Sequence, residues 1–183
     1  ASVAAGGLSE GTALAITPDG HFLYCIAGKR DNKSFSNQLI YQYRIRADGS
    51  LEPSAPAEVA AGDRPRSIAI TPNGRFAYVI DIRMNLILEY RIRQNGTPTL
   101  LTHNYMPVIA PDSSGASPLW VTISPDGRFV YTANADSNNI SQFKIGGDGI
   151  LTRLNPATVR TGEAPLSITF GPNSNVAYVP CTG

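Results

Sequence analysis

Residues 65–81 read PRSIAITPNGRFAYVID, and this stretch decides the fold because its pattern occurs four times along the chain. Apolar side chains alternate through 65–71, as expected of a β-strand with one buried face. Pro72, Asn73 and Gly74 favour a tight reversal, because proline presets φ and the next two residues tolerate turn conformations. A second strand follows over 75–81, so the stretch predicts an antiparallel β-hairpin.

The same hairpin is predicted at three other places, where the first strand begins at Gly11, Pro118 or Pro165. Each copy has a strand, a turn with proline followed by Asp or Asn, and a second strand with tyrosine at a fixed position. The tyrosines are Tyr24, Tyr78, Tyr131 and Tyr178. A repeat of about 50 residues built from several short strands is typical of β-propeller blades.

Three copies continue into a third strand, an Asp-Gly or Asn-Gly turn and a fourth strand, expected over 57–61, 104–110 and 157–160. We therefore predict an all-β fold: a β-propeller of four-stranded antiparallel blades, with about 3.5 to 4 blades in this chain. The whole chain, 1–183, forms one partial propeller in this interpretation. Its predicted units are 1–10 (the last strand of a preceding blade), 11–61, 62–110 and 111–161 (blades) and 162–183 (the first two strands of a further blade).

Composition excludes several classes of protein. The 183 residues are 42% hydrophobic and 16% charged, with a net charge of +1. A disordered chain is excluded, and neither a nucleic-acid partner nor a membrane partner is expected. Cys25 and Cys181 are predicted to be free thiols, and His21 and His103 to be exposed bystanders. No metal and no cofactor are expected, because ligand spacings and nucleotide-binding motifs are absent.

Two patterns resemble a known family. The stretch 118–134 resembles the YVTN-type propeller repeat, and YRIRADG at 43–49 with YRIRQNG at 90–96 resembles the lactonase-like seven-bladed propellers. That family includes 6-phosphogluconolactonase and carboxymuconate cyclase. The resemblance implies a seven-bladed ring and a lactone-hydrolysing or cyclase-type activity.

The same resemblance implies a histidine near the start of the first strand, but this chain has none there. The matching column reads Ala13, Ser67, Trp120 and Ser167. Histidine is the usual group for proton transfer near neutral pH. A carboxylate such as Asp81 or Glu163 would have to replace it, and the catalytic residues stay unknown.

The connections before each first strand and after each second strand vary in length, and strand direction places both on one rim. Variable loops on a rigid scaffold collect binding residues. Arginine there suits a small carboxylated or phosphorylated ligand, and tryptophan can stack on a ligand or pack on the next blade. Asp81 and Asn134, which have short polar side chains, are expected to cap loops. The alternative for the charged residues of the rim is that they are simply solvated surface residues. The candidate ligand-binding residues are Arg64, Arg66, Asp81, Arg83, Trp120, Asn134 and Asp136.

The missing histidine favours a propeller scaffold that presents its rim to a protein or small anionic ligand. The alternative is a lactonase or cyclase of the resembling family. A seven-bladed ring needs about twice this length, and an open half-ring exposes apolar faces and strand edges. We therefore expect a second propeller segment or self-association. Sequence predicts a soluble chain and leaves secreted, periplasmic and cytoplasmic locations open.

Overall fold

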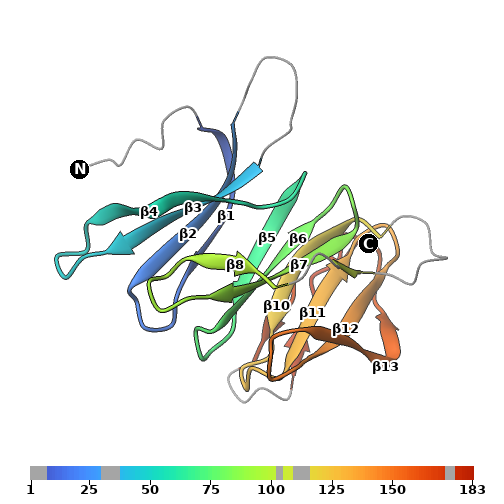
Figure 1. The fold of residues 1–183 in the computed structure, drawn as a ribbon. Helices are drawn as coiled ribbons and strands as arrows, with labels where there is room; N and C mark the ends of the chain where they lie inside the picture. The colour runs from blue at the N-terminus through green and yellow to red at the C-terminus, as the bar shows by residue number, and fades with distance from the viewer. Residues whose placement is uncertain (1–7, 30–37, 102–104, 109–115, 172–175) are drawn as a thin grey trace.

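The computed structural model describes residues 8–29, 38–101, 105–108, 116–171 and 176–183, and every regular element in them is a β-strand. Three sheets follow one another along the chain, and part of a fourth closes the series (Figure 1). The first sheet contains β1 (Leu8–Ile16), β2 (Phe22–Lys29), β3 (Gln38–Ile45) and β4 (Leu51–Ala60). The second contains β5 (Pro65–Ile70), β6 (Phe76–Asp81), β7 (Leu86–Ile92), β8 (Pro98–Leu100) and β9 (Met106–Pro107). The third contains β10 (Pro118–Ile123), β11 (Phe129–Asn134), β12 (Asn139–Ile145) and β13 (Leu151–Arg160), and the last contains β14 (Thr169–Phe170) and β15 (Ala177–Tyr178).

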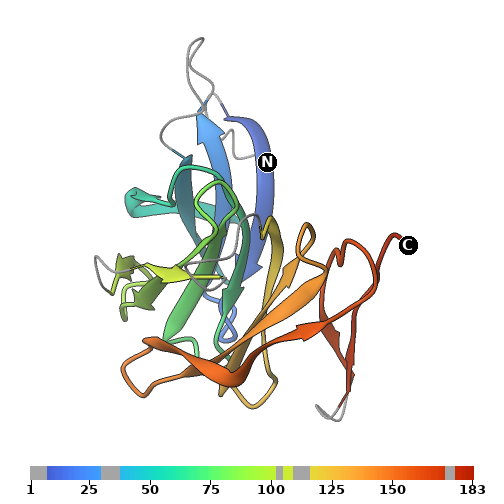
Figure 2. The same ribbon diagram turned by 90° about the vertical axis from the view of Figure 1, so that its right-hand side faces the viewer.

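All pairings are antiparallel between strands that are neighbours in sequence, apart from β9, which pairs with β7. The innermost strands β1, β5 and β10 lie side by side, with β5 in the middle. The sheets fan outward from these strands, as Figures 1 and 2 show from two directions. The predicted all-β, four-stranded propeller architecture is confirmed for this part of a ring.

The fourth strands differ from their predicted limits. β4 and β13 begin directly after the Asp-Gly turns, at Leu51 and Leu151, and run without a break to Ala60 and Arg160. A register shift in each pairing lets the strand extend from the turn to the residues predicted for it, 57–61 and 157–160. β1 begins at Leu8 and pairs there with β2, although 1–10 was assigned to a preceding blade. The rest of that segment, 1–7, lies outside the described residues.

The three proline turns within the described residues share one hydrogen-bond arrangement. In the first, the hydroxyl of Thr17 donates to Asp19 (2.6 Å) and accepts from the backbone N–H of Phe22 (3.0 Å). Asp19 also accepts from the N–H of His21, and Gly20 adopts a φ of 73°. The turns at 71–76 and 124–129 repeat this arrangement. These local bonds explain why a short turn sequence predicts the hairpins so well.

The hydrophobic core lies between neighbouring sheets, and buried tyrosines link each blade to the next. Tyr24 and Tyr78 are fully buried, and each hydroxyl donates to a turn glycine carbonyl of the following blade, that of Gly96 (2.6 Å) or Gly149 (2.8 Å). Gly149 has a φ of +93°, and a Cβ there would lie 2.3 Å from the ring of Phe76. Glycine is therefore required both by the backbone conformation and by the close approach of the ring.

Removing one of these hydroxyls is expected to weaken the joint between blades. Tyr78→Phe should lower the free energy of unfolding by about 1–2 kcal/mol, because a buried carbonyl loses its donor. Urea unfolding measures the change. Tyr178→Phe is the control, since Tyr178 is 62% exposed, and it should change stability by less than about 0.5 kcal/mol. Equal losses in the two variants would contradict this assignment.

The two end blades carry apolar surface that inner blades cover. Leu14 is 67% exposed, whereas the matching Ile68 and Val121 are 8% and 2% exposed. At the other end, Leu166 and Val176 are 44% and 53% exposed. Burying such surface is favourable at roughly 25 cal/mol per Å². Both ends of the series are thus suited to further packing.

Candidate functional site on the variable rim

Asp81 organises the rim of the second blade. It ends β6, is 1% exposed, and accepts hydrogen bonds from four backbone N–H groups. One carboxylate oxygen accepts from Asp63 (2.7 Å) and Arg64 (3.3 Å), and the other from Arg83 (3.0 Å) and Met84 (3.1 Å). These donors come from the two variable connections, so Asp81 ties both connections together. The structure therefore confirms the prediction that the side chain at position 81 caps a loop.

This geometry corrects the idea that Asp81 could transfer protons. Both of its oxygens are occupied by structural donors, and the carboxylate faces the loop backbone rather than solvent. Glu163, the other carboxylate considered, is exposed on the rim. Asp81 is therefore a positioning residue.

The loops that Asp81 holds carry Arg64 and Arg83, and Arg66 follows on β5. We call these three residues the arginine set. All three are exposed. Arg83 forms an ion pair with Asp63, with 3.0 Å between Nη1 and Oδ2. The guanidinium groups of Arg64 and Arg66 have no hydrogen-bond or ion-pair partner among the described residues. Such groups are well suited to an anionic ligand, because guanidinium binds carboxylate and phosphate in a bidentate manner.

The predicted residues of the third blade play different parts. Asn134 is fully buried, accepts from the hydroxyl of Thr132 (3.0 Å), and donates to Asn139 and Ser141 (2.7 Å each). Its side chain is thus fixed inside the blade and is out of reach of a ligand. Asp136 is exposed, and only its backbone N–H is bonded in the described structure, to Ala116 at 3.3 Å.

Trp120 lies on β10, beside the strand that carries Arg66, and is 42% exposed. The matching residue of the second blade, Ser67, is buried and accepts from the N–H of Val121 in the following blade (3.2 Å). This column therefore faces the next innermost strand, which places Trp120 on the side of the fourth blade. Its exposed part leaves both stacking on a ligand and packing possible.

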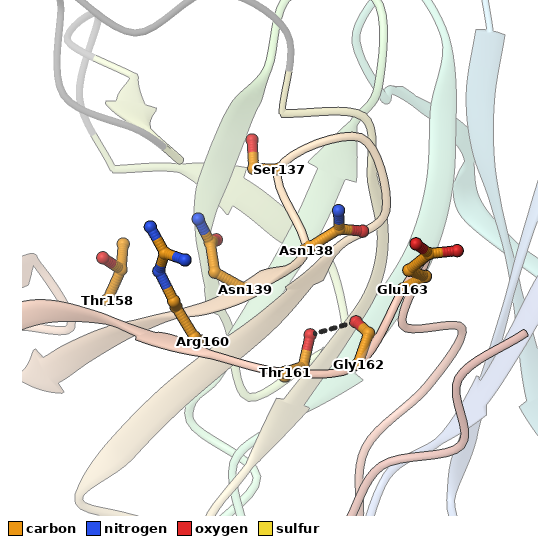
Figure 3. A pocket seen from close by; sticks show the side chains of 8 residues that line it. All are labelled: Ser137, Asn138, Asn139, Thr158, Arg160, Thr161, Gly162 and Glu163. Carbon is orange, nitrogen blue, oxygen red and sulfur yellow. Dashed lines mark hydrogen bonds between the residues drawn. The ribbon is translucent and has the colours of Figure 1, made fainter. Parts of the chain in front are cut away.

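A cavity of about 770 Å³ lies at the outer part of the same rim, between the third blade and the start of the fourth. Figure 3 shows Thr158, Arg160 and Asn139 grouped at one end and Glu163 at the other. The residues that line it are Ser137, Asn138, Asn139, Thr158, Arg160, Thr161, Gly162 and Glu163. The candidate ligand-binding residues predicted from sequence include none of these, and only Glu163 was considered there, as a possible proton-transfer group.

Two asparagines link successive blades at the rim, and sequence reasoning missed them. Asn85 and Asn138 each precede a third strand and have φ values of 54° and 52°. Their side-chain oxygens accept from the N–H of Ser117 (3.1 Å) and of Ala164 (2.8 Å), at the start of the next blade. Both asparagines stand directly before a third strand, and this shared position could have identified them in the sequence, because asparagine tolerates the left-handed conformation.

A buried carboxyl away from the rim was also missed. Glu89 on β7 is 3% exposed, and one of its oxygens accepts from the N–H of Leu151 in the next blade (3.1 Å). Its other oxygen has no hydrogen-bond partner among the described residues. Burial, with a contribution from nearby Asp148, raises the pKa of Glu89 to about 7. The first and third blades have Gln42 and Gln142 in this column, and that contrast is visible in the sequence.

The other residues considered from sequence are two histidines and two cysteines. His21 is exposed on its turn, 3.2 Å from Asp19, whereas His103 lies outside the described residues. Cys25 and Cys181 are free thiols, as predicted, and both are half-buried. Over the described ranges, no group of three His, Cys, Asp or Glu side chains is placed to hold a metal ion. The described part of the chain contains no helix with the length and apolar character needed to span a bilayer.

Comparison with known proteins finds a matching family for the chain. Residues 13–181 match the family described as "Lactonase, 7-bladed beta-propeller". A 6-phosphogluconolactonase of Enterobacter sp. (strain 638) is 30% identical over 138 residues, which are 73% of this chain and 39% of that protein. A 6-phosphogluconolactonase of Yersinia pestis (strain Pestoides F) is 31% identical over 117 residues, or 61% of this chain and 34% of that protein. The chain thus matches less than half the length of these curated relatives.

Solved structures agree on the fold. A protein of unknown function from Desulfotomaculum acetoxidans superposes with a TM-score of 0.77 at 22% identity, over 96% of this chain and 50% of that one. The periplasmic gluconolactonase of Pseudomonas aeruginosa gives a TM-score of 0.72 at 22% identity, over 97% of this chain and 51% of that one. The chain therefore spans about half of a complete propeller of this kind.

Proposed function

Because the chain belongs to the seven-bladed lactonase β-propeller family, we propose that its variable rim serves the hydrolysis of a lactone that carries a phosphate or carboxylate group. In this reaction water adds to the lactone carbonyl carbon and the ring carbon–oxygen bond breaks. The ring oxygen leaves as a hydroxyl group, and the new carboxylic acid ionises. One proton is therefore released to solvent for each lactone consumed.

The observation that carries the proposal is the arginine set. Arg64 and Arg66 are exposed and have no partner among the described residues, and Arg83 is held beside them by its ion pair with Asp63. Hydrogen bonds from Asp81 already fix the backbone of both loops, so the loops need little reordering when an anion binds. In this proposal the arginines bind and orient the anionic group of the substrate. Trp120, on the neighbouring strand, faces the fourth blade and not the arginine set, so no contact with the substrate is assigned to it.

A second candidate function is binding without hydrolysis, by a scaffold that presents the rim to an anionic ligand or a protein. The observation that favours it is the inner column of Ala13, Ser67, Trp120 and Ser167, which holds no group for proton transfer. Hydrolysis normally gains from a positioned acid or base. Binding and turnover therefore have to be measured separately.

We expect Arg66→Ala to weaken binding of the anionic ligand about tenfold or more, because a charge-assisted hydrogen bond contributes about 1.5–3 kcal/mol. Isothermal titration calorimetry measures binding of 6-phosphogluconate, and proton release measures hydrolysis of 6-phosphogluconolactone. Arg93→Ala is the matched control, since Arg93 is exposed on a turn of the opposite rim.

The outcomes separate the two functions. Proton release that falls in Arg66→Ala and not in Arg93→Ala supports the lactonase. Ligand binding with the same dependence on Arg66 but without proton release supports the scaffold. Equal effects of the two substitutions, or neither binding nor turnover, would refute the assignment of the arginine set.

A further inference from the structure

A groove of about 450 Å³ lies between the first and second blades, on the rim opposite the variable one. Its walls are the proline turns of these two blades and the turn that follows β7. The proline turns lie against each other, because a Cβ on Gly74 would be 3.7 Å from Cδ of Pro18 (Figure 1). The backbone N–H of Ile92 donates to the carbonyl of Arg75 (2.8 Å) and joins the third wall to the second proline turn. The groove is therefore built from turns that are already fixed, and its volume is within the range of ligand sites, about 300–1,000 Å³.

Two arginines of the second blade line this groove. Arg75 belongs to the proline turn and Arg93 directly follows β7, and both are exposed. Arg75 lies over the ring of Phe76, with 5.4 Å between Cζ and the ring centroid. Neither guanidinium group forms a hydrogen bond or an ion pair among the described residues. One groove thus has two positive charges that no carboxylate of the described chain neutralises.

The third blade shows which partner Arg75 lacks. There the matching Arg128 forms an ion pair with Asp126, with 2.7 Å between Nε and Oδ2. The second blade has Asn73 in place of this aspartate. The side-chain oxygen of Asn73 still accepts from the hydroxyl of Thr71 (2.7 Å) and from the N–H of Arg75 (3.0 Å). The turn is preserved, but the second carboxylate oxygen that would bind the arginine is missing.

Arg93 lacks its partner because of a separate difference between blades. In the first blade the matching Arg46 forms an ion pair with Glu52, with 2.8 Å between Nη2 and Oε1. This glutamate stands six positions after its arginine, and Thr99 stands at the same distance after Arg93. A neutral threonine cannot neutralise a guanidinium group. Two independent replacements of an acidic residue have therefore left unpaired arginines at the same groove.

The matching place between the second and third blades differs. Gly146 stands there at the position of Arg93, and Arg128 is occupied by its ion pair with Asp126. The unpaired pair of arginines is thus a property of the groove between the first and second blades and not of the repeat as such.

The remaining lining of the groove indicates the class of ligand. The exposed rings of Pro18 and Pro72 provide apolar surface beside the arginines. One carboxylate, that of Asp19, also lines the groove, and it accepts from the hydroxyl of Thr17 (2.6 Å) within its own turn. An exposed ion pair contributes only about 0–1 kcal/mol, and Asp19 repels a second anion, so a small anion gains little here. A longer ligand that contacts both arginines and the proline rings gains from all of them together.

We propose that this surface, which we call the opposite-rim groove, is a docking site for an extended acidic peptide segment of a partner protein. Alternate side chains of an extended peptide point to the same side. Acidic residues at every second position therefore present their carboxylates to Arg75 and Arg93, which can bind them in a bidentate manner. The peptide backbone crosses the rings of Pro18 and Pro72. This docking site does not depend on the activity proposed for the variable rim.

A labelled peptide of sequence Ser-Glu-Leu-Glu-Pro-Glu-Ser is the probe, and the same peptide with glutamine at the three acidic positions is its control. Fluorescence anisotropy with the 183-residue chain should show saturable binding of the acidic peptide only. Raising the salt concentration from about 50 mM to about 500 mM should raise the Kd about fivefold or more, because exposed charges are screened.

Arg75→Gln and Arg93→Gln should each raise the Kd about threefold to fivefold, and the double variant about tenfold or more, because each removes one exposed ion pair. Arg128→Gln and Arg46→Gln are the matched controls. They remove the arginines at the same two positions of other blades, where a carboxylate already binds them, and they should leave the Kd unchanged.

A second set of variants keeps both arginines and restores their carboxylates. Asn73→Asp should pair with Arg75 as in the third blade, and Thr99→Glu should pair with Arg93 as in the first. Each should raise the Kd about threefold or more although no arginine is removed. A merely structural role of the arginines would not produce this result.

Four results would overturn the proposal. The first is no saturable binding of the acidic peptide, or equal binding of the glutamine peptide. The second is a rise in Kd in Arg46→Gln as large as that in Arg93→Gln. The third is displacement of the peptide by 6-phosphogluconate, which would assign the groove to small anions. The fourth is a concentration-dependent dimer in sedimentation that the double arginine variant abolishes, which would assign it to a second copy. Lactone hydrolysis is measured separately by proton release, so failure of either proposal leaves the other standing.

Discussion

Glu89→Gln is expected to raise the free energy of unfolding by about 3 kcal/mol at pH 9 and to change it little at pH 4. The carboxyl is buried between the second and third blades, and one oxygen accepts from the N–H of Leu151 while the other has no partner among the described residues. Burial raises its pKa from 4.5 to about 7, and the charge of Asp148 adds to the shift. A neutral amide of the same shape avoids the cost of ionising in this place.

The direction of the pH dependence follows from the sign of the shift. The unfolded carboxyl loses its proton near pH 4.5, but the folded one holds it until about pH 7. As pH rises through this window the unfolded state is favoured, so the native chain loses stability and the loss stays constant at higher pH. Below pH 4.5 the carboxyl is neutral in both states. The advantage of glutamine therefore appears between these two values.

Urea unfolding at pH 4, 7 and 9 measures the effect. Glu163→Gln is the matched control, because Glu163 is exposed on the rim and its substitution should change stability by less than about 0.5 kcal/mol at each pH. A Glu89→Gln effect of equal size at pH 4 and pH 9 would mean that packing, not ionisation, governs this position. The other blades already carry the amide, as Gln42 and Gln142.

Local structure could be predicted from sequence because its causes are local. The first-to-second strand hairpins follow from turns such as that of Thr17, Asp19 and Gly20, in which all hydrogen bonds lie within six residues. The loop-capping place of Asp81 was visible as a column of the repeat. The third-strand turns were likewise predicted from their Asp-Gly and Asn-Gly pairs.

Contacts between blades could not be predicted, because they join residues that lie 26 to 72 positions apart in the sequence. No local pattern shows that the Gly96 carbonyl accepts from Tyr24, or that Glu89 accepts from Leu151. The same limit applies to the site. Sequence placed Arg64 and Arg83 on the rim, but their shared support on Asp81 depends on where two separate loops meet in space.

Asp81→Ala is expected to lower the free energy of unfolding by about 3–5 kcal/mol, because four backbone N–H groups lose their shared acceptor and a buried space is left. Asp81→Asn should cost about 2 kcal/mol, since an amide keeps one acceptor oxygen and turns its NH2 group toward two donors. Asn134 shows why the third blade tolerates an amide at the matching position. There the NH2 group meets the oxygens of Asn139 and Ser141, whereas only donors converge on Asp81.

Urea unfolding gives the size of the loss, and amide hydrogen exchange locates it. In Asp81→Ala the N–H groups of Asp63, Arg64, Arg83 and Met84 should exchange faster than those of β7, because their acceptor is removed while the sheet remains. Asp136→Ala is the control: this carboxylate is exposed on the same rim and should leave stability within about 0.5 kcal/mol. A loss below about 1 kcal/mol in Asp81→Ala, with the four amides still protected, would contradict the role of Asp81 as the support of both loops. If the loss is large and those amides alone are released, the arginine set depends on a buried carboxylate that no ligand touches.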